Sequence, residues 1–274
     1  MPAAPAVKVA VISGGSSGIG LACARCLLAR GYQVVLLARV MDKLHSARAE
    51  LGPDFAASVE LIPTDVDDPA SCQAAIEAVT HRYGHIDWLI TSAGIVEPGM
   101  FLDLDLATHR AQMETNYFGT LHLIQAVVPV MRPMGGRITL VSSGAAFLGI
   151  VGYSAYAPSK FAVRALAEIL RLELEPEGIA ISVAFPPDTE TPQLARERQS
   201  RPPVTRLIAE QGGTMTADQV AERIISRAEK GAFILAPSGP VAFLARCHSL
   251  YGRLFAWQQR RLLKRFGPQR ASSR

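Results

Sequence analysis

Residues 8–20 read KVAVISGGSSGIG, and this stretch decides the fold. The first six residues are mostly apolar and β-branched, as in a buried parallel strand. Four glycines follow within seven residues, and a helical pattern then runs from Leu21 to Arg30 and ends at Gly31. This order is typical of a dinucleotide site, because the glycines and the helix N-terminus bring backbone N–H groups close to a pyrophosphate.

The alternation of strand and helix continues along the chain. We predict strands at 8–13, 33–38, 58–64, 87–91, 136–142, 179–185 and 232–236, and helices at about 21–30, 107–133, 156–175 and 216–229, with another starting near Pro69. Such alternation predicts an α/β fold with a Rossmann-type, doubly wound, parallel seven-stranded sheet and helices on both faces. We expect this domain to span 1–236, with an irregular substrate segment at about 187–215, and a basic amphipathic helical tail at 237–274.

The predicted ligand positions follow the strands, whose carboxyl ends share one edge of a parallel sheet. Arg39 stands after the second strand, with Lys43 one helical turn further on, where an NAD site usually has an acidic residue. Two cations there indicate the 2′-phosphate of NADP, unless they form a solvated surface pair. The Asp65-Val66 pair follows the third strand, where the carboxylate could accept from adenine or could cap the next helix.

Tyr156 and Lys160 are four residues apart, so they share one face of a predicted helix. A phenol has a pKa of ~10 and transfers protons poorly at neutral pH unless a nearby positive charge stabilises its phenolate. The pair alone also fits a half-buried tyrosine beside a solvated lysine. The surrounding motifs favour the chemical interpretation.

Composition excludes several classes of protein. The chain has 274 residues, of which 49% are hydrophobic and 19% charged, yet no run of 18 apolar residues predicts a membrane span. We expect no signal peptide, because no basic region precedes a long apolar stretch at the N-terminus. Cys23 and Cys26 form a C-x-x-C without a second ligand pair, so we interpret them as small core residues rather than a metal site.

Several motifs in order closely resemble the short-chain dehydrogenase/reductase family, over about residues 7–235. They are GGSSGIG at 14–20, the AG of TSAG at 91–94, Asn116 in NYFG, Ser143 thirteen residues before Tyr156, YAPSK at 156–160, and the proline and threonines of PPDTET at 186–191. Two departures stand out: Thr91-Ser92 replaces the usual Asn-Asn, which puts the usual contacts there in doubt, and Pro187 replaces the usual glycine.

The resemblance implies roles for individual residues. Tyr156 would be the general acid in ketone reduction, and Lys160 would lower its pKa and bind the nicotinamide ribose. Ser143 would hydrogen-bond the substrate carbonyl, and Asn116 would anchor a proton-relay water. The cofactor-binding set would be Gly14, Ser16, Ser17, Gly18, Ile19, Gly20, Arg39, Lys43, Asp65, Val66, Ala93, Gly94, Tyr156, Lys160, Pro186, Thr189 and Thr191.

A narrower likeness concerns the substrate. FPPDTETP at 185–192, TRLIAE at 205–210 and LLAR at 36–39 resemble the family members that reduce a long-chain 3-keto amine lipid in sphingolipid synthesis. This implies an NADPH-dependent reductase. The alternatives are a reductase or dehydrogenase of another apolar ketone or alcohol, such as a 3-ketoacyl chain, steroid or retinoid, and a non-catalytic NADP-binding regulatory protein. The intact Ser143, Tyr156, Lys160 and Asn116 set argues against the last.

The tail carries a charge asymmetry. Nine basic residues and no acidic one follow Glu229, so the net charge of +4 leaves −5 for residues 1–229. The basic residues are Lys230, Arg246, Arg253, Arg260, Arg261, Lys264, Arg265, Arg270 and Arg274. No nucleic-acid-binding motif accompanies these cations, which argues against binding to nucleic acid.

The residues at 241–266 also have amphipathic helical spacing. Leu244, Cys247, Tyr251, Leu254, Phe255, Leu262 and Phe266 share one side of this predicted helix. An apolar face backed by arginines suits an anionic membrane surface, whereas packing on the domain or on a dimer partner is the alternative. We expect a homo-oligomer, dimer or tetramer, in the cytoplasm and peripheral on the cytoplasmic face of a membrane.

Overall fold

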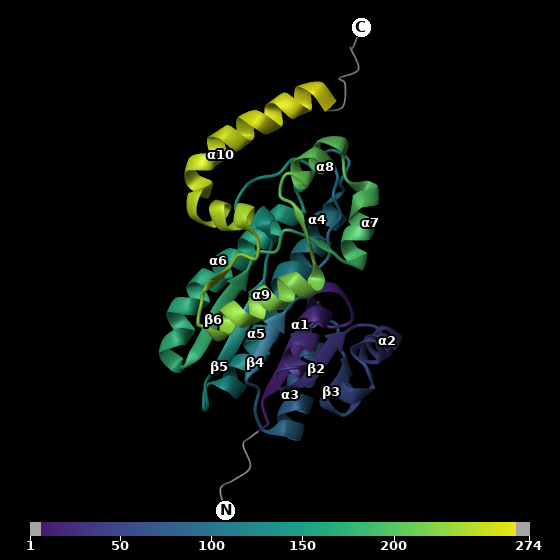
Figure 1. Ribbon diagram of the computed structural model, residues 1–274, viewed down its shortest axis with the longest axis vertical. Coiled ribbons are helices and arrows are strands. Elements are labelled where there is room, and N and C mark those ends of the chain that lie inside the picture. Colours follow the sequence, from purple (N-terminus) through teal and green to yellow (C-terminus); the bar gives the residue numbers. More distant parts are fainter. Residues whose placement is uncertain (1–6, 267–274) are drawn as a thin grey trace, which may run out of the picture.

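The computed structural model describes residues 7–266, which form a three-layer α/β domain that continues into a long C-terminal helix (Figure 1). Seven parallel strands form the central sheet in the order β3-β2-β1-β4-β5-β6-β9. Their bounds are β1 Val9–Ser13, β2 Gln33–Ala38, β3 Val59–Pro63, β4 Trp88–Thr91, β5 Gly136–Val141, β6 Ile179–Ala184 and β9 Ile234–Leu235. The predicted parallel seven-stranded sheet is therefore confirmed.

Helices cover both faces of this sheet (Figure 1). The helices are α1 Gly18–Leu28, α2 Met41–Leu51, α3 Pro69–Tyr83, α4 Leu106–Met113, α5 Gly119–Met131, α6 Tyr156–Leu174, α7 Pro192–Ser200, α8 Pro203–Glu210, α9 Ala217–Glu229 and α10 Gly239–Phe266. One buried apolar cluster joins the sheet to α1, α2 and α9, and a second joins it to α3, α5 and α6. The sheet order reverses between β2-β1 and β1-β4, and ligands bind at such a switch point.

Strand β1 shows why its sequence is apolar throughout. Val9 and Val11 point into one buried cluster, whereas Ala10 and Ile12 point into the other. Successive side chains on a strand point to opposite faces, so a strand covered by helices on both sides needs apolar residues at every position. The predicted core position is confirmed for Cys23, which is fully buried in the cluster that joins α1 and α9, and Cys26 packs against this cluster partly buried.

The predicted helix at 107–133 is interrupted. A π-helical turn at Glu114–Phe118 separates α4 from α5 and carries Asn116. The Asn116 side chain is fully buried, and its Oδ1 accepts from the Ile95 backbone N–H at 2.8 Å while its Nδ2 donates to the Ile95 carbonyl at 3.0 Å. The turn therefore ties the helix to the segment after β4, in keeping with the occurrence of π-turns at functional sites.

The expectation of an irregular segment at 187–215 is wrong. The chain forms β7 Asp188–Glu190, α7, α8 and β8 Thr214–Thr216 there, and β7 and β8 pair in parallel. Helix α7 starts at Pro192, with the Thr191 hydroxyl accepting from the Leu194 N–H at 3.1 Å, and α8 starts at Pro203. Both prolines therefore open helices, as proline does at a first helical position, rather than preventing them.

Helix α10 extends from the domain along α8, and Figure 1 shows its C-terminal part reaching beyond the sheet. Leu244, Tyr251 and Phe255 pack against the domain core, and the Gln259 side chain bonds the Val151 N–H and the Gly149 carbonyl at 2.8 and 2.9 Å. Across residues 7–266, no helix combines the length and hydropathy needed to cross a membrane. Of the nine basic tail residues, Arg270 and Arg274 lie outside the described residues.

The two sides of α10 differ from the predicted amphipathic face. Leu244, Tyr251 and Phe255 are partly buried, whereas the most exposed apolar residues are others. These are Phe243, Leu250, Leu254 and Trp257, which are between 50% and 86% exposed, followed by Phe266 at 43%. The helix therefore has two apolar surfaces, an inner side that faces the domain and an outer stripe that is exposed. The sequence analysis predicted only one apolar face. The division of the chain at 236 stays a prediction.

Candidate active site

A cavity of about 710 Å³ follows the edge of the sheet at which the strands end. It is lined by Gly14, Ser16, Ser17, Gly18, Ile19, Arg39, Lys43, Val66, Ala93, Gly94, Ser143, Tyr156, Lys160, Pro186, Thr189 and Thr191, which all belong to the predicted site. The structure thus brings most of the predicted positions together. Gly20, Asp65 and Asn116 do not line this cavity.

The glycine loop is shaped by two positions that exclude a side chain. Gly14 has φ 65°, and a Cβ there would lie 2.8 Å from the backbone of Ser92 and Ala93. A Cβ on Gly20 would lie 2.4 Å from the Gly14 carbonyl oxygen. No side chain caps the first turn of α1, since Ser17 makes no such bond. These features leave a backbone cradle at the start of a helix, which fits a dinucleotide pyrophosphate.

The end of β2 presents two cations to the same cavity. Arg39 and Lys43 are both exposed and line it, and neither forms an ion pair within residues 7–266. Unpaired cations here suit a phosphate on the adenosine ribose. Asp65 instead faces its own turn, where its Oδ1 accepts from the Asp67 N–H at 3.2 Å, while Asp68 caps α3. Its contact with adenine stays a prediction.

The departure at Thr91-Ser92 is compensated by another side chain. The Ser13 hydroxyl at the end of β1 accepts from the Ser92 and Ala93 N–H groups at 3.1 and 3.2 Å. This serine therefore fixes the chain after β4, where the family pattern has asparagines. Gly94 follows, and a Cβ there would lie 3.0 Å from Asn116 Oδ1 and 3.4 Å from Lys160 Nζ.

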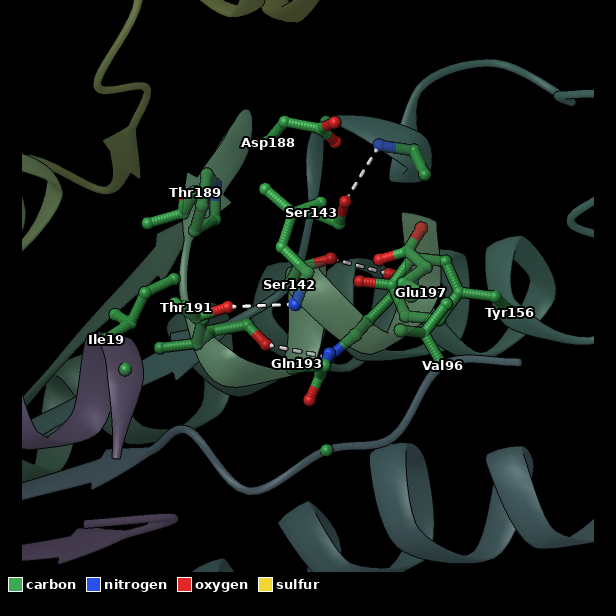
Figure 2. Close-up of a pocket in the computed structure, with 18 of the residues that line it drawn as sticks. Ile19, Val96, Ser142, Ser143, Tyr156, Asp188, Thr189, Thr191, Gln193 and Glu197 are labelled. Atoms are coloured by element: carbon green, nitrogen blue, oxygen red, sulfur yellow. Dashed lines mark hydrogen bonds between the residues drawn. The ribbon is translucent and has the colours of Figure 1, made fainter. Parts of the chain in front are cut away.

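The proposed catalytic side chains surround the middle of the cavity. Tyr156 opens α6, and Lys160 lies one turn along it with Nζ 5.8 Å from the Tyr156 ring centroid. Lys160 Nζ donates to the Val141 carbonyl at 3.2 Å. Ser143 follows β5, and Figure 2 shows it beside the same part of the cavity as Tyr156. Asn116 stands behind them, donating to Ser159 Oγ at 2.9 Å.

Burial sets the protonation of the two central groups. Burial raises the pKa of the Tyr156 phenol, the Glu197 carboxylate raises it further, and a hydrogen bond with Ser143 lowers it. Burial lowers the pKa of Lys160 to about 8. The phenol is therefore protonated at neutral pH, as a proton donor must be. The lowering of its pKa by Lys160, implied by the family resemblance, stays a prediction.

Sequence analysis missed a charged network beside Tyr156. Arg201 donates to both oxygens of Asp188, at 2.5 and 2.8 Å, and its Nε donates to Glu197 Oε1 at 2.9 Å. The Tyr153 hydroxyl also donates to Glu197 Oε1. All four residues line the cavity. The only local signal was the four-residue spacing of Glu197 and Arg201, since Asp188 and Tyr153 are remote in sequence.

The far end of the cavity is apolar. Pro240, Val241, Phe243, Leu244, Tyr251 and Phe255 of α10 line it together with Leu148, Ile150, Leu194 and Ile208. The cavity therefore runs from a cationic, glycine-lined end, past Ser143 and Tyr156, to an apolar end closed by α10. A molecule that fills it needs a phosphate-rich part, a reactive polar part and an apolar part.

Comparison with known proteins shows similarity to reductases, one of which was solved with NADPH. Residues 8–202 match the family described as short chain dehydrogenase. A 3-ketodihydrosphingosine reductase of Bos taurus is 38% identical over 228 residues, covering 81% of this chain and 69% of that protein. A 3-dehydrosphinganine reductase of Danio rerio is 38% identical over 229 residues, with the same shares covered. The solved structure of an actinorhodin polyketide ketoreductase variant with NADPH is 27% identical, covers 86% of this chain and 97% of its own, and has a TM-score of 0.78.

Proposed function

The chain belongs to the short-chain dehydrogenase/reductase family, and from that premise we propose that it reduces 3-ketodihydrosphingosine to sphinganine with NADPH. The observation that carries the proposal is the single cavity that joins the glycine loop, the tyrosine and lysine of α6, and the apolar inner side of α10. Its three parts match a dinucleotide, a ketone and a long alkyl chain. The relatives named as reductases of this lipid support the same substrate.

The chain's own groups then divide the work of ketone reduction. NADPH, when bound, would supply a hydride to the carbonyl carbon, which would leave the carbonyl oxygen as an alkoxide. Ser143 donates a hydrogen bond to that oxygen, and Tyr156 delivers the proton that completes the alcohol. Lys160 holds the ribose and adds positive charge near the phenol. Asn116 fixes the segment after β4 and anchors a relay water that restores the proton to Tyr156.

The cationic end of the cavity supports NADPH rather than NADH as the cofactor. Arg39 and Lys43 pair with the 2′-phosphate, and the glycine loop holds the pyrophosphate at the start of α1. Thr189 and Thr191 also line the cavity, and Thr191 packs directly on the loop, since its Cγ2 would be 2.9 Å from a Cβ on Gly18. The segment that contains β7 therefore packs against the glycine loop, and this position supports Pro186, Thr189 and Thr191 as cofactor contacts.

The decisive experiment is NADPH consumption with synthetic 3-ketodihydrosphingosine, with the product identified by mass spectrometry against sphinganine. We expect one sphinganine for each NADPH oxidised, and much slower oxidation of NADH. A 3-ketoacyl thioester, a ketosteroid and a retinal serve as rival substrates in the same assay. Preference for one of them would replace the sphingoid substrate. NADPH binding without turnover of any ketone would favour the regulatory alternative.

We also propose that the outer stripe of α10 rests on an anionic membrane surface, which would place the enzyme at the cytoplasmic face of a membrane. The stripe consists of Leu250, Leu254 and Trp257, with Phe243 at its edge, where this half-exposed ring also lines the cavity. Arg246, Arg253 and Arg260 are exposed on the same helix. Exposed aromatic and aliphatic residues beside cations suit anionic headgroups. The inner side of the same helix lines the cavity, so a lipid substrate would have a short path from the membrane.

Self-association is a separate proposal. Phe161, Ile169 and Leu172 of α6 are exposed by 38%, 53% and 78%, and Phe118 beside α5 is exposed by 39%. Exposed apolar residues on neighbouring helices suit a second copy of the chain. Sedimentation at increasing protein concentration measures this directly, and a monomer at every concentration would remove the proposal.

A further inference from the structure

The substrate side of the cavity carries an unbalanced negative charge. Asp188, Glu197 and Arg201 form one connected network, so two carboxylates share a single guanidinium. The side chains of Arg201 and Glu197 are 3% and 9% exposed, which removes them from bulk screening. Arg196 also lines the cavity but is exposed, and Lys160 donates to the Val141 carbonyl and forms no ion pair with either carboxylate. A buried excess charge of this kind is costly unless a cation meets it.

Asp188 and Glu197 differ in how many of their carboxylate oxygens accept a hydrogen bond. Both oxygens of Asp188 accept from Arg201, so this pair is complete. In Glu197, the bonds from Tyr153 and Arg201 all go to Oε1. Within residues 7–266, no hydrogen bond reaches Glu197 Oε2. Glu197 is nine-tenths buried yet lines the cavity, and Figure 2 shows it in the same part of the cavity as Ser143 and Tyr156.

We propose that Glu197 binds the ammonium group of the substrate and thereby selects an amino ketone over a neutral ketone. This inference rests on the proposed function and adds the recognition of the head group. The amino nitrogen of 3-ketodihydrosphingosine is on the carbon next to the carbonyl. When Ser143 and Tyr156 hold the carbonyl oxygen, the ammonium must therefore lie within a few ångströms of them, in the region that Glu197 faces. Oε2 then accepts a charge-assisted hydrogen bond.

The same carboxylate acts against neutral ketones. Glu197 raises the pKa of the Tyr156 phenol, second only to burial, which shows that its negative charge is felt at the reacting group. An alkoxide that forms near a carboxylate whose charge is only partly balanced is destabilised by repulsion between like charges. An ammonium bound between them removes that repulsion. The carboxylate thus favours the amino ketone both by attraction and by penalising a substrate that brings no cation.

The test is a crossed comparison of two proteins with two substrates. The substrates are 3-ketodihydrosphingosine and its desamino analogue, in which hydrogen replaces the amino group, presented in the same mixed micelles with saturating NADPH. Glu197→Gln removes the charge but keeps an acceptor oxygen for Tyr153 and Arg201. We expect its kcat/KM to fall about 10-fold to 100-fold for the amino ketone, the range of a charge-assisted hydrogen bond. For the desamino analogue, kcat/KM should stay equal or rise.

Glu190→Gln is the matched control, because Glu190 lies in β7, is exposed and does not line the cavity. It should leave both substrates unchanged. Equal losses of kcat/KM on both substrates in Glu197→Gln would overturn the ammonium proposal and leave a purely structural role, while wild-type turnover would still support the reductase. If the wild-type chain reduces only the desamino analogue, both the substrate and its recognition are wrong.

A substrate-side measurement covers the case in which Glu197→Gln does not fold. The wild-type chain should prefer the amino ketone over the desamino analogue by about 10-fold or more in kcat/KM. It should also be inhibited more strongly by sphinganine than by the desamino alcohol. Equal kcat/KM values and equal inhibition in the wild type would overturn the proposal without any variant.

Discussion

The two ends of the cavity are held together by different kinds of contact. The cofactor end, formed by β1, the glycine loop and β2, is fixed by backbone geometry, as at Gly14 and Gly20. The substrate end, formed by β7, α7, α8 and α10, is held by side chains from distant parts of the sequence, above all the Arg201 network. The first kind of contact is local and is visible in a motif, whereas the second depends on the finished fold.

The largest expected effect tests whether ion pairs hold the substrate end. Arg201→Met leaves the buried Glu197 and the partly buried Asp188 without their cation, and removing one partner of a buried pair costs about 3–5 kcal/mol. We expect the free energy of unfolding, measured in denaturant, to fall by that amount. Arg198→Met, at an exposed position of α7, should change it by less than about 0.5 kcal/mol. If both substitutions lowered the free energy of unfolding equally, the ion pairs of Arg201 would not be what holds the substrate end together.

A second prediction concerns the junction of the two ends. Tyr156→Phe keeps the ring but removes the proton, so turnover should fall by at least ~10²-fold while the dissociation constant for NADPH is unchanged. Tyr117→Phe is the control, because Tyr117 lies in the π-helical turn and does not line the cavity. Near-normal turnover in Tyr156→Phe would exclude this phenol as the proton donor.

The cofactor end is tested by Arg39→Ala. A charge-assisted bond to the 2′-phosphate contributes ~1.5–3 kcal/mol, so the KM for NADPH should rise by about 10-fold or more, and the KM for NADH should stay unchanged. Arg48→Ala changes a cation of the following helix, α2, that does not line the cavity, and it should affect neither cofactor. A similar rise for both cofactors would show that Arg39 does not read the phosphate.

The difference between the two ends also explains what could be predicted from the sequence. The parallel sheet and the cofactor side of the cavity lining were predicted, because strands with apolar residues on both faces and the loop at 14–20 carry their geometry in adjacent residues. The roles of the lining residues stay predictions. The helices at 192–210 were missed, because α7 is polar and shows no apolar helical period that would have set it apart from an irregular segment.

The substrate end was harder to predict for a physical reason. Tyr153 and Glu197 are 44 residues apart, and Asp188 and Arg201 are 13 apart, so no local period links them. The compensation at Ser13 is similar, because its bonds to Ser92 and Ala93 span about 80 residues and exist only when β1 and β4 are paired. Such contacts follow from the register of the sheet and not from any motif.

The smallest expected effect concerns helix α10. In our proposal its inner side binds the substrate and its outer stripe binds the membrane. Removing the whole helix would mix them, because its inner side lines the cavity. Leu254→Glu changes only the outer stripe, where Leu254 is 50% exposed, and a partly inserted leucine contributes about 1 kcal/mol. Binding to phosphatidylserine-containing vesicles in co-sedimentation should therefore weaken about fivefold, and more clearly at low salt. Turnover of a small water-soluble ketone should not change. Met134→Glu introduces the same charge at a 66% exposed apolar position after α5 and should not weaken vesicle binding. If Leu254→Glu reduces turnover but not sedimentation, the outer stripe supports the cavity wall, and the membrane proposal is wrong.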